Sequence, residues 1–422
     1  MENSVLHQRA ASFSDSASVS SPHPSHTHDP PPQQMAYWSG VFAMTLCVFA
    51  LIASEFMPVS LLTLMAADLR VSEGMAGLGI AISGAFAVVT SLFISAVAGS
   101  MNRKILLLGL TGVMALSGAV IALAPTYLVY MAGRVLIGVV VGGFWSLSAA
   151  TAMRLVPPHQ VPRALAVFNG GNALATVVAA PLGSYLGAIV GWRGAFYCLV
   201  PVALVSLAWQ WISLPAMPVA SRSGGSGHVF AHLRRPVVAC GMLAAAIFFA
   251  GQFTLFTYIR PFLETVTQVN ASTLSVMLLV IGAAGFLGTM VIGTVLKRAF
   301  YFTLIAIPAL MAAIAVALIA FGHQRGAVFA LLALWGLVST AAPVGWWSWI
   351  TRTFPHHPEA GGGLMVAVVQ LAIAMGSTVG GVLFDTLGYR STLEASAALL
   401  VLAAVLAYLT SYGEPNAVPS NT

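Results

Sequence analysis

The sequence predicts an all-α integral membrane protein in which twelve transmembrane helices form two six-helix halves. Hydrophobic residues make up 59% and charged residues 7% of the chain, whereas soluble domains carry about 25% charged residues. Residues 274–296 and 302–322 contain no charge, and each run is long enough to cross the hydrocarbon core, which needs roughly 20 helical residues. So few charges could not cover a water-soluble fold.

Twelve apolar segments follow a Ser-, Pro- and His-rich start that has no signal-peptide pattern. Their centres lie near residues 50, 87, 115, 140, 175, 205, 248, 285, 311, 338, 373 and 402. The longest break separates six segments from six, a layout typical of transporters built from repeats. We expect a disordered cytoplasmic tail, an N-terminal six-helix bundle, a cytoplasmic linker, a C-terminal six-helix bundle and a short cytoplasmic tail, at 1–36, 37–213, 214–236, 237–412 and 413–422.

Basic residues indicate the orientation of the segments. The net charge is +6, but the basic residues stand singly or in pairs in short loops, which excludes a nucleic-acid surface and fits the positive-inside rule. With both termini in the cytoplasm, eleven fall inside: Arg9, Arg103, Lys104, Arg154, Arg163, Arg222, Arg234, Arg235, Lys297, Arg298 and Arg352. Five fall outside: Arg70, Arg193, Arg260, Arg325 and Arg390. This count predicts cytoplasmic termini.

Short matches between the two halves indicate an internal duplication. The sequence GFWS at 143–146 is matched by GWWS at 345–348, and the pair Arg103–Lys104 recurs as Lys297–Arg298. Each half would then contribute equivalent helices to the fold.

Glu55 and Arg134 are the charges that lie well inside the predicted segments. Each falls about two turns from the expected outer surface, so we expect them to face each other at similar depth. A buried carboxylate with a basic neighbour can bind a proton or a substrate group. The alternative is a static ion pair that locks the bundle. Pro58, three residues after Glu55, disturbs the same helix.

Uncharged polar and aromatic residues on the apolar segments are candidates for substrate binding. They supply hydrogen bonds and stacking faces for a polar, planar solute. Hydrogen bonding between helices is the competing use of the polar groups, and anchoring at the membrane interface is that of the tryptophans. The candidates are Asn169, Asn172, Trp145, Gln252, Thr257, Tyr258, Trp346 and Gln370.

An enzyme would need a catalytic group of residues at depth. All ten histidines lie in predicted tails, loops or segment edges, Glu55 has no second deep acid, and no phosphate-binding loop is present. The three cysteines are widely spaced in or beside apolar segments, as buried apolar residues are. We therefore expect neither an enzyme nor a metal or other cofactor.

Three motifs resemble those of the major facilitator superfamily, of the drug:proton antiporter type. They are Arg134-x-x-x-Gly138 in the fourth segment, GSMNRK at 99–104, and APLG at 180–183. Asn102 stands where an Asp is usual. The resemblance implies the major facilitator fold, with gating roles for Asn102, Arg103, Pro181 and Gly183.

Finer stretches are similar to the proton-driven sugar and nucleoside efflux group, and within it to purine ribonucleoside efflux pumps. They are EFMPVSLL at 55–62, GGFWS at 142–146, GQFT at 251–254 and FTYIRP at 256–261. The resemblance implies a monomer in the bacterial inner membrane that exports inosine, adenosine, guanosine and analogues in exchange for protons. A proton-coupled sugar or multidrug exporter of the same superfamily is the alternative.

Overall fold

Every regular element in the described part of the chain is helical. The computed structural model describes residues 36–98, 101–217, 236–353 and 358–413, so almost all of the predicted tails and linker lies outside it. All contacts below fall within Met35–Thr422. The helices are α1 (Trp38–Leu69), α2 (Glu73–Ala98), α3 (Arg103–Ala122), α4 (Tyr127–Arg154), η1 (Pro158–Gln160), α5 (Val161–Ser213), α7 (Pro236–Phe256), α8 (Ile259–Thr265), α9 (Ala271–Arg298), α10 (Phe300–Phe321), α11 (Arg325–Ser339), α12 (Ala342–Thr353), α13 (Pro358–Leu387) and α14 (Tyr389–Gly413).

Eleven stretches in these ranges are long and apolar enough to span a membrane, and one of them is two spans. Helix α5 has 53 residues, about 80 Å of helix against roughly 30 Å of hydrocarbon. It is broken at Gly191, where φ is 75° and ψ is 168°, a conformation essentially restricted to glycine. The predicted number of twelve transmembrane helices is thereby confirmed.

The two arms of α5 pack on α1 in opposite directions. Gly171 abuts the first turns of α1 and Gly187 abuts its later turns, so the first arm runs parallel to α1. Beyond Gly191 the chain returns, and the Ser213 hydroxyl lies 2.8 Å from that of Ser39 at the start of α1. The fifth and sixth predicted segments are therefore a pair that reverses at one residue.

Each half also contains a glycine contact that supports the predicted duplication. A side-chain carbon on Gly143 of α4 would lie 2.9 Å from the Leu110 side chain of α3. One on Gly345 of α12 would lie 2.9 Å from the Leu304 side chain of α10. The two glycines belong to the matched sequences GFWS and GWWS, so these sequences occupy equivalent places.

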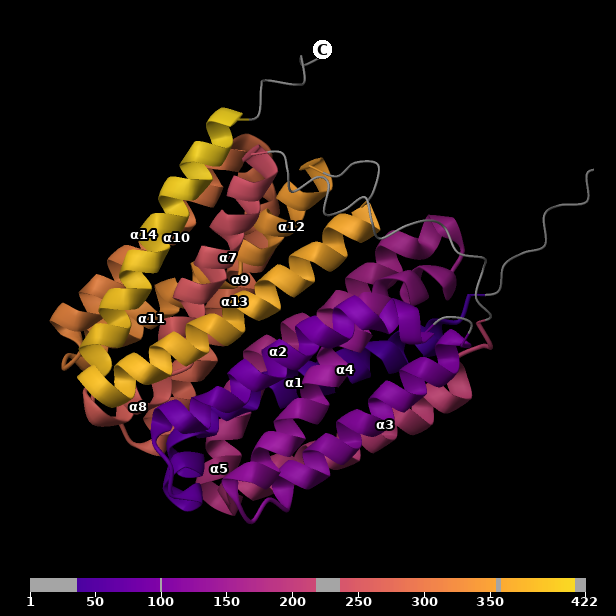
Figure 1. The fold of residues 1–422 in the computed structure, drawn as a ribbon, viewed down its shortest axis with the longest axis horizontal. Helices are drawn as coiled ribbons and strands as arrows, with labels where there is room; N and C mark the ends of the chain where they lie inside the picture. Colours follow the sequence, from indigo (N-terminus) through magenta and orange to yellow (C-terminus); the bar gives the residue numbers. More distant parts are fainter. Residues whose placement is uncertain (1–35, 99–100, 218–235, 354–357, 414–422) are drawn as a thin grey trace, which may run out of the picture. The chain divides into compact units, whose positions relative to one another are not determined.

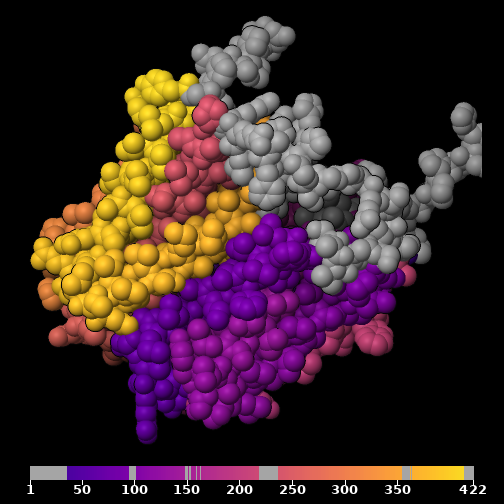
Figure 2. Space-filling model, in the orientation of Figure 1, coloured from indigo at the N-terminus to yellow at the C-terminus, as the bar shows by residue number. Residues whose placement is uncertain are grey.

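Two helix pairs make the most extensive contacts between the two halves, α1–α5 and α7–α14. Helices α2 and α13 lie side by side (Figure 1), and a carbon on Gly84 would be 2.8 Å from the Gln370 carbonyl oxygen. In the space-filling view, the indigo surface of α2 adjoins the yellow-orange surface of α13 (Figure 2). Helices α5 and α9 form the second pair, with Gly282 against the backbone of Val177. Close backbone approach at glycines brings groups of both halves into contact.

Candidate substrate and proton site

The site begins with the helix break that Pro58 imposes on α1. Proline has no N–H, so the carbonyl of Ser54, four residues earlier, lacks its helical donor. Arg134 of α4 supplies the missing hydrogen bond: its Nη1 lies 3.0 Å from the Ser54 oxygen, and its Nη2 lies 3.2 Å from the Glu55 carbonyl oxygen. A charged side chain from another helix thus repairs the break beside Glu55.

The remaining donors of Arg134 hold α2. Nε lies 2.8 Å from the Gly79 carbonyl oxygen, and Nη2 lies 2.9 Å from the Ser83 hydroxyl. The Arg134 side chain is fully buried. A guanidinium presents five N–H donors in a planar fork, so one side chain fixes three helices around the same point.

The Glu55 carboxylate points to the other half of the protein. The residue is 4% exposed, and its Oε1 accepts a hydrogen bond of 3.2 Å from Nε2 of Gln370 on α13. Glu55 and Arg134 lie together as predicted. However, no ion pair joins their side chains within the described ranges, so the static ion pair is not formed. The reason is that Pro58 leaves main-chain oxygens for Arg134 to bind.

An aromatic pair that begins at Phe56, the residue after Glu55, was not predicted. The rings of Phe56 and Phe253 are stacked, with centroids 5.7 Å apart and an interplanar angle of 29°. Beside Phe253, the Gln252 side chain has a buried Oε1 that lacks a hydrogen-bond partner among the described residues. Two adjacent residues of α1 and two of α7 therefore bring a carboxyl, an amide and two rings to one interface.

Two other predicted residues of this segment are engaged in packing. The Thr257 hydroxyl lies 3.1 Å from the Ser377 hydroxyl, and Tyr258 donates to the Ser377 carbonyl oxygen at 2.8 Å. Both residues are buried. In this conformation these hydroxyls join α7–α8 to α13.

The asparagines of α5 lie on its partly open face. Asn169 is exposed and bonds the Leu165 carbonyl oxygen of its own helix at 3.0 Å. Asn172 is half-buried. The two lie one turn apart, as their spacing predicts.

The tryptophans lie apart from Glu55. Trp145 is eleven residues beyond Arg134 on α4, about 16 Å along the helix, and makes an edge contact with Phe168. Trp346 is 2% exposed and packs in the core of the second half against Phe248 and Trp349. The structure does not bring these two rings to the carboxylate.

Of the predicted gating residues, Asn102 bonds through its side chain and Arg103 through its main chain, whereas the Arg103 Nη1 is buried and has no partner among the described residues. The Asn102 carboxamide caps α3 by accepting from the Lys104 N–H at 3.0 Å, and it accepts from the Met217 N–H at 3.0 Å. The Arg103 N–H donates to the Met217 carbonyl at 3.1 Å. These bonds join the loop before α3 to the chain after α5. Gly99 and Ser100 of the same motif lie outside the described residues.

Pro181 and Gly183 lie in the first arm of α5, where it packs on α1. A side-chain carbon on Gly183 would lie 2.5 Å from the Ser60 hydroxyl and 3.0 Å from the Met57 side chain. The contact falls beside the Pro58 break, so any larger residue at 183 would push α5 away from it.

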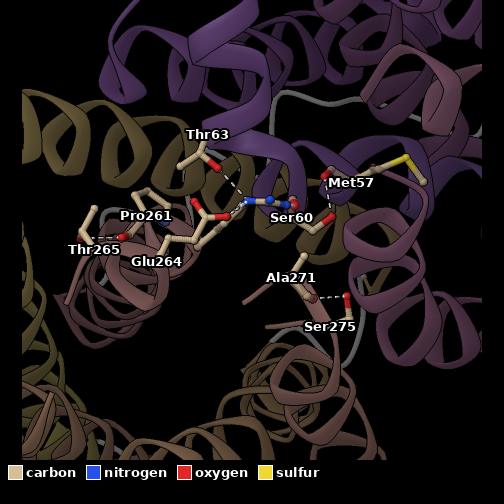
Figure 3. A network of polar contacts seen from close by, with 9 residues as sticks. Met57, Ser60, Thr63, Pro261, Glu264, Thr265, Ala271 and Ser275 are labelled. Carbon is tan, nitrogen blue, oxygen red and sulfur yellow. Dashed lines mark hydrogen bonds and ion pairs between the residues drawn. The ribbon is translucent and has the colours of Figure 1, made fainter. Parts of the chain in front are cut away.

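Arg260 corrects the sequence-based topology, which placed it in an outside loop. It lies in α8, is 3% exposed, and its Nε lies 2.7 Å from the Thr63 hydroxyl and 2.8 Å from Glu264 Oε1 (Figure 3). Its Nη1 also donates to the Ser60 carbonyl oxygen. The Arg260 guanidinium is therefore hydrogen-bonded to partners in both halves. These partners could not be predicted from the sequence, because two of them belong to α1. We call Arg260, Glu264, Thr63 and Ser60 the Arg260 network.

A second polar contact joins the halves at the start of α2. Asp385, near the end of α13, accepts the Gly74 N–H at 3.0 Å and the Ser72 hydroxyl at 2.5 Å. A carboxylate is favourable at a helix N-terminus because it satisfies free N–H groups and the helix dipole. This contact could not be predicted from the sequence around α2, because the capping residue Asp385 belongs to the other half of the protein.

Twelve spans in two related halves, enclosing a carboxyl and amides at their interface, define a multi-pass membrane transport protein rather than an enzyme. Residues 44–377 match the sequence model of the family described as the Major Facilitator Superfamily. The chain belongs to this superfamily, and a small-molecule substrate follows from that membership.

Similar proteins include two named relatives. The chain is 66% identical over 383 residues to "Transcription regulatory protein OpdE" of Pseudomonas aeruginosa, covering 90% of this chain and 95% of the relative. It is 40% identical over 369 residues to "Purine ribonucleoside efflux pump NepI" of Salmonella typhimurium, covering 87% and 93%.

Two solved structures share the fold. An inward-facing, unoccupied bacterial homologue of the human lysosomal transporter Spinster has a TM-score of 0.72 at 16% identity, covering 89% of this chain and 97% of the other. The nucleoside transporter NupG has a TM-score of 0.71 at 12% identity, covering 89% and 99%.

Proposed function

We propose that this protein exports purine ribonucleosides across the bacterial inner membrane in exchange for protons. The observation that carries the proposal is the Glu55 carboxyl, 4% exposed and hydrogen-bonded to Gln370 of the opposite half. A carboxyl at the interface of two rocking halves can take up a proton on one side and release it on the other. Glu55 is the proton carrier, and Arg134 holds it in position.

The chemistry around Glu55 and one relative support a nucleoside as the substrate. Phe56 and Phe253 offer aromatic faces for a planar base. The Gln252 and Gln370 amides, with Asn169 and Asn172 along α5, offer donors and acceptors for a base edge and a ribose. The Salmonella relative, 40% identical over 87% of this chain, is named a purine ribonucleoside efflux pump.

Transport by this route requires the halves to move as two bodies. We place them at residues 37–213 and 237–412, in a lipid-embedded monomer with both termini in the cytoplasm. The Arg260 network and the Asp385 contact then lie on the outer side and close it, and their bonds must break when the site opens outward. Asn102, Arg103, Pro181 and Gly183 remain candidates for the opposite gate.

A transport function is also compatible with the name of the 66% identical relative, "Transcription regulatory protein OpdE". A membrane protein changes transcription indirectly when it changes the cellular concentration of a solute that a regulator binds. In this chain the basic residues stand in short loops between spans, so we assign it no DNA contact.

The test is uptake of labelled inosine into inverted membrane vesicles, with a proton gradient imposed and then collapsed. We expect uptake that follows the gradient and is competed by adenosine and guanosine but not by sugars. Glu55→Gln should lose uphill uptake while retaining exchange of inosine for inosine. Gradient-independent uptake, or uptake of sugars alone, would contradict the proposal.

A further inference from the structure

The Gln370 side chain makes only half of the hydrogen bonds that an amide needs. Its Nε2 donates to Glu55, whereas its Oε1 is buried and has no partner among the described residues. The residue is 6% exposed. A buried polar atom without a partner is costly and calls for an explanation.

The protonation state of Glu55 decides which atom of the amide it can satisfy. A charged carboxylate only accepts hydrogen bonds, so it must face the NH₂ group of Gln370, as it does here. A protonated carboxyl also has an O–H donor, which can bond Oε1 once the amide turns over. Oε1 therefore lacks a donor when Glu55 is charged and gains one when Glu55 is neutral.

We propose that Gln370 Oε1 is the acceptor for which the proton on Glu55 and an N–H of the substrate base compete. This inference rests on the proposed function and names the step that couples the two solutes. In the proton-loaded state the Glu55 O–H donates to Oε1. When a base N–H takes Oε1, that bond breaks, the amide turns its NH₂ group to the carboxylate, and the proton leaves to water. One proton is released for each solute bound.

The charged neighbours permit this exchange. Arg134 bonds the Glu55 main chain and not its carboxylate, so it stays in place in both states. Arg260 and Glu264 of α8 are bonded to each other, and Arg260 contacts α1 further along, at Ser60 and Thr63. Among the described residues, the titratable groups near this part of α1 are Arg134, Tyr130 beside Arg134, and the Arg260–Glu264 pair, and Cys47 lies about two turns earlier on α1 itself.

The position of the amide selects the chemical class of the substrate. Glu55, bonded to Gln370, is followed by Phe56, which stacks on Phe253. A planar base at these rings presents its edge to the amide, so an N–H on that edge is required. Inosine carries such a donor at N1, and 1-methylinosine does not.

Calorimetry on the purified protein tests the competition. Inosine binding is measured in two buffers of different ionisation enthalpy, which counts the protons released. At pH values where free Glu55 is protonated, wild type should release about one proton per inosine. Because binding releases a proton, the affinity for inosine should rise about tenfold for each unit by which the pH is raised. Gln370→Met should bind inosine more weakly, with no proton released and less than about twofold change per pH unit.

Gln252→Met is the matched control, because Gln252 has the same orphan amide oxygen without a bond to Glu55. It should lose affinity and still release the proton. Full proton release by Gln370→Met would overturn the inference and leave nucleoside antiport standing. Absence of inosine binding by folded wild type would overturn both.

A ligand analogue keeps the test decisive if Gln370→Met does not fold. Wild type should bind 1-methylinosine weakly and release no proton per bound molecule. Release of a full proton on binding 1-methylinosine would overturn the role of Oε1, because that ligand lacks the competing donor.

Discussion

Arg134 holds the main chain of Glu55 and leaves its carboxylate free. Nη2 of Arg134 lies 3.2 Å from the Glu55 carbonyl oxygen, while the carboxylate bonds Gln370. A direct ion pair would keep the carboxylate charged, since an opposite charge favours the ionised form. Binding the backbone instead fixes the position of Glu55 and keeps its carboxyl available for a proton.

Arg134→Lys should strongly destabilise the protein. Lysine cannot reach four acceptors in two directions, so carbonyls at the Pro58 break lose their donors, at a cost of about 2–4 kcal/mol. Thermal unfolding in detergent measures the loss. Arg325→Lys is the control: Arg325 is exposed and donates to one carbonyl, that of Gln268. Equal effects of both variants would contradict the role given to Arg134.

Pro58→Ala should make Arg134 less necessary. Alanine restores the N–H that bonds the Ser54 carbonyl within α1. Loss of Arg134, as Arg134→Met, should then cost about 1 kcal/mol less in the Pro58→Ala background. A double-mutant cycle of unfolding free energies gives this difference. Strictly additive effects would mean that Arg134 does not substitute for the missing helical bond.

Arg260→Met should weaken the contact between the halves at the Arg260 network. The variant removes the bonds to Thr63 and to the Ser60 carbonyl. Distances between spin labels at the exposed residues 123 and 268, in a cysteine-free background, should lengthen or broaden.

The control is Glu264→Gln, which leaves the bonds to α1 in place. Its distance distribution should match that of the wild type. If Arg260→Met also left the distribution unchanged, the network would have no part in closing this end of the protein.

Gly142→Ala should destabilise the packing of α4 on α2. The new carbon would collide with the backbone carbonyl of Ala87, and two backbones must separate, at about 1–3 kcal/mol. Gly109→Ala on α3 is the control for this substitution, because nothing lies within 4 Å of the carbon that it adds. It should be neutral or stabilising by up to about 1 kcal/mol, since alanine favours helix. If Gly142→Ala and Gly109→Ala lowered the unfolding temperature by the same amount, the close contact of α4 with α2 would be disproved.

Composition and apolar runs predict the number and place of the helices, because lipid leaves the backbone few alternatives. The same reasoning finds Glu55 and Arg134, as charges are rare in such runs. It fails for Arg260: a charge near a segment end is assigned to a loop, whereas its partners are Thr63 and the Ser60 carbonyl of another helix.

The partner of Glu55 could not be predicted from sequence spacing. Gln370 is 315 positions away, and the contact exists because glycines let α2 and α13 approach closely. Trp145 and Trp346 were selected for their matched positions, and the contacts of Gly143 and Gly345 support that match. Two residues at equivalent positions in the two halves need not line the same substrate site. Trp346, for example, is buried within its own half.

The reversal of α5 at Gly191 has a practical consequence. Two spans are joined by a single glycine conformation, with helix on both sides, so no flexible segment projects there for a protease to cut or an antibody to recognise. An epitope inserted at this bend would have to interrupt helix that runs up to Gly191 on both sides. The pair should also enter the bilayer as one preformed hairpin during synthesis.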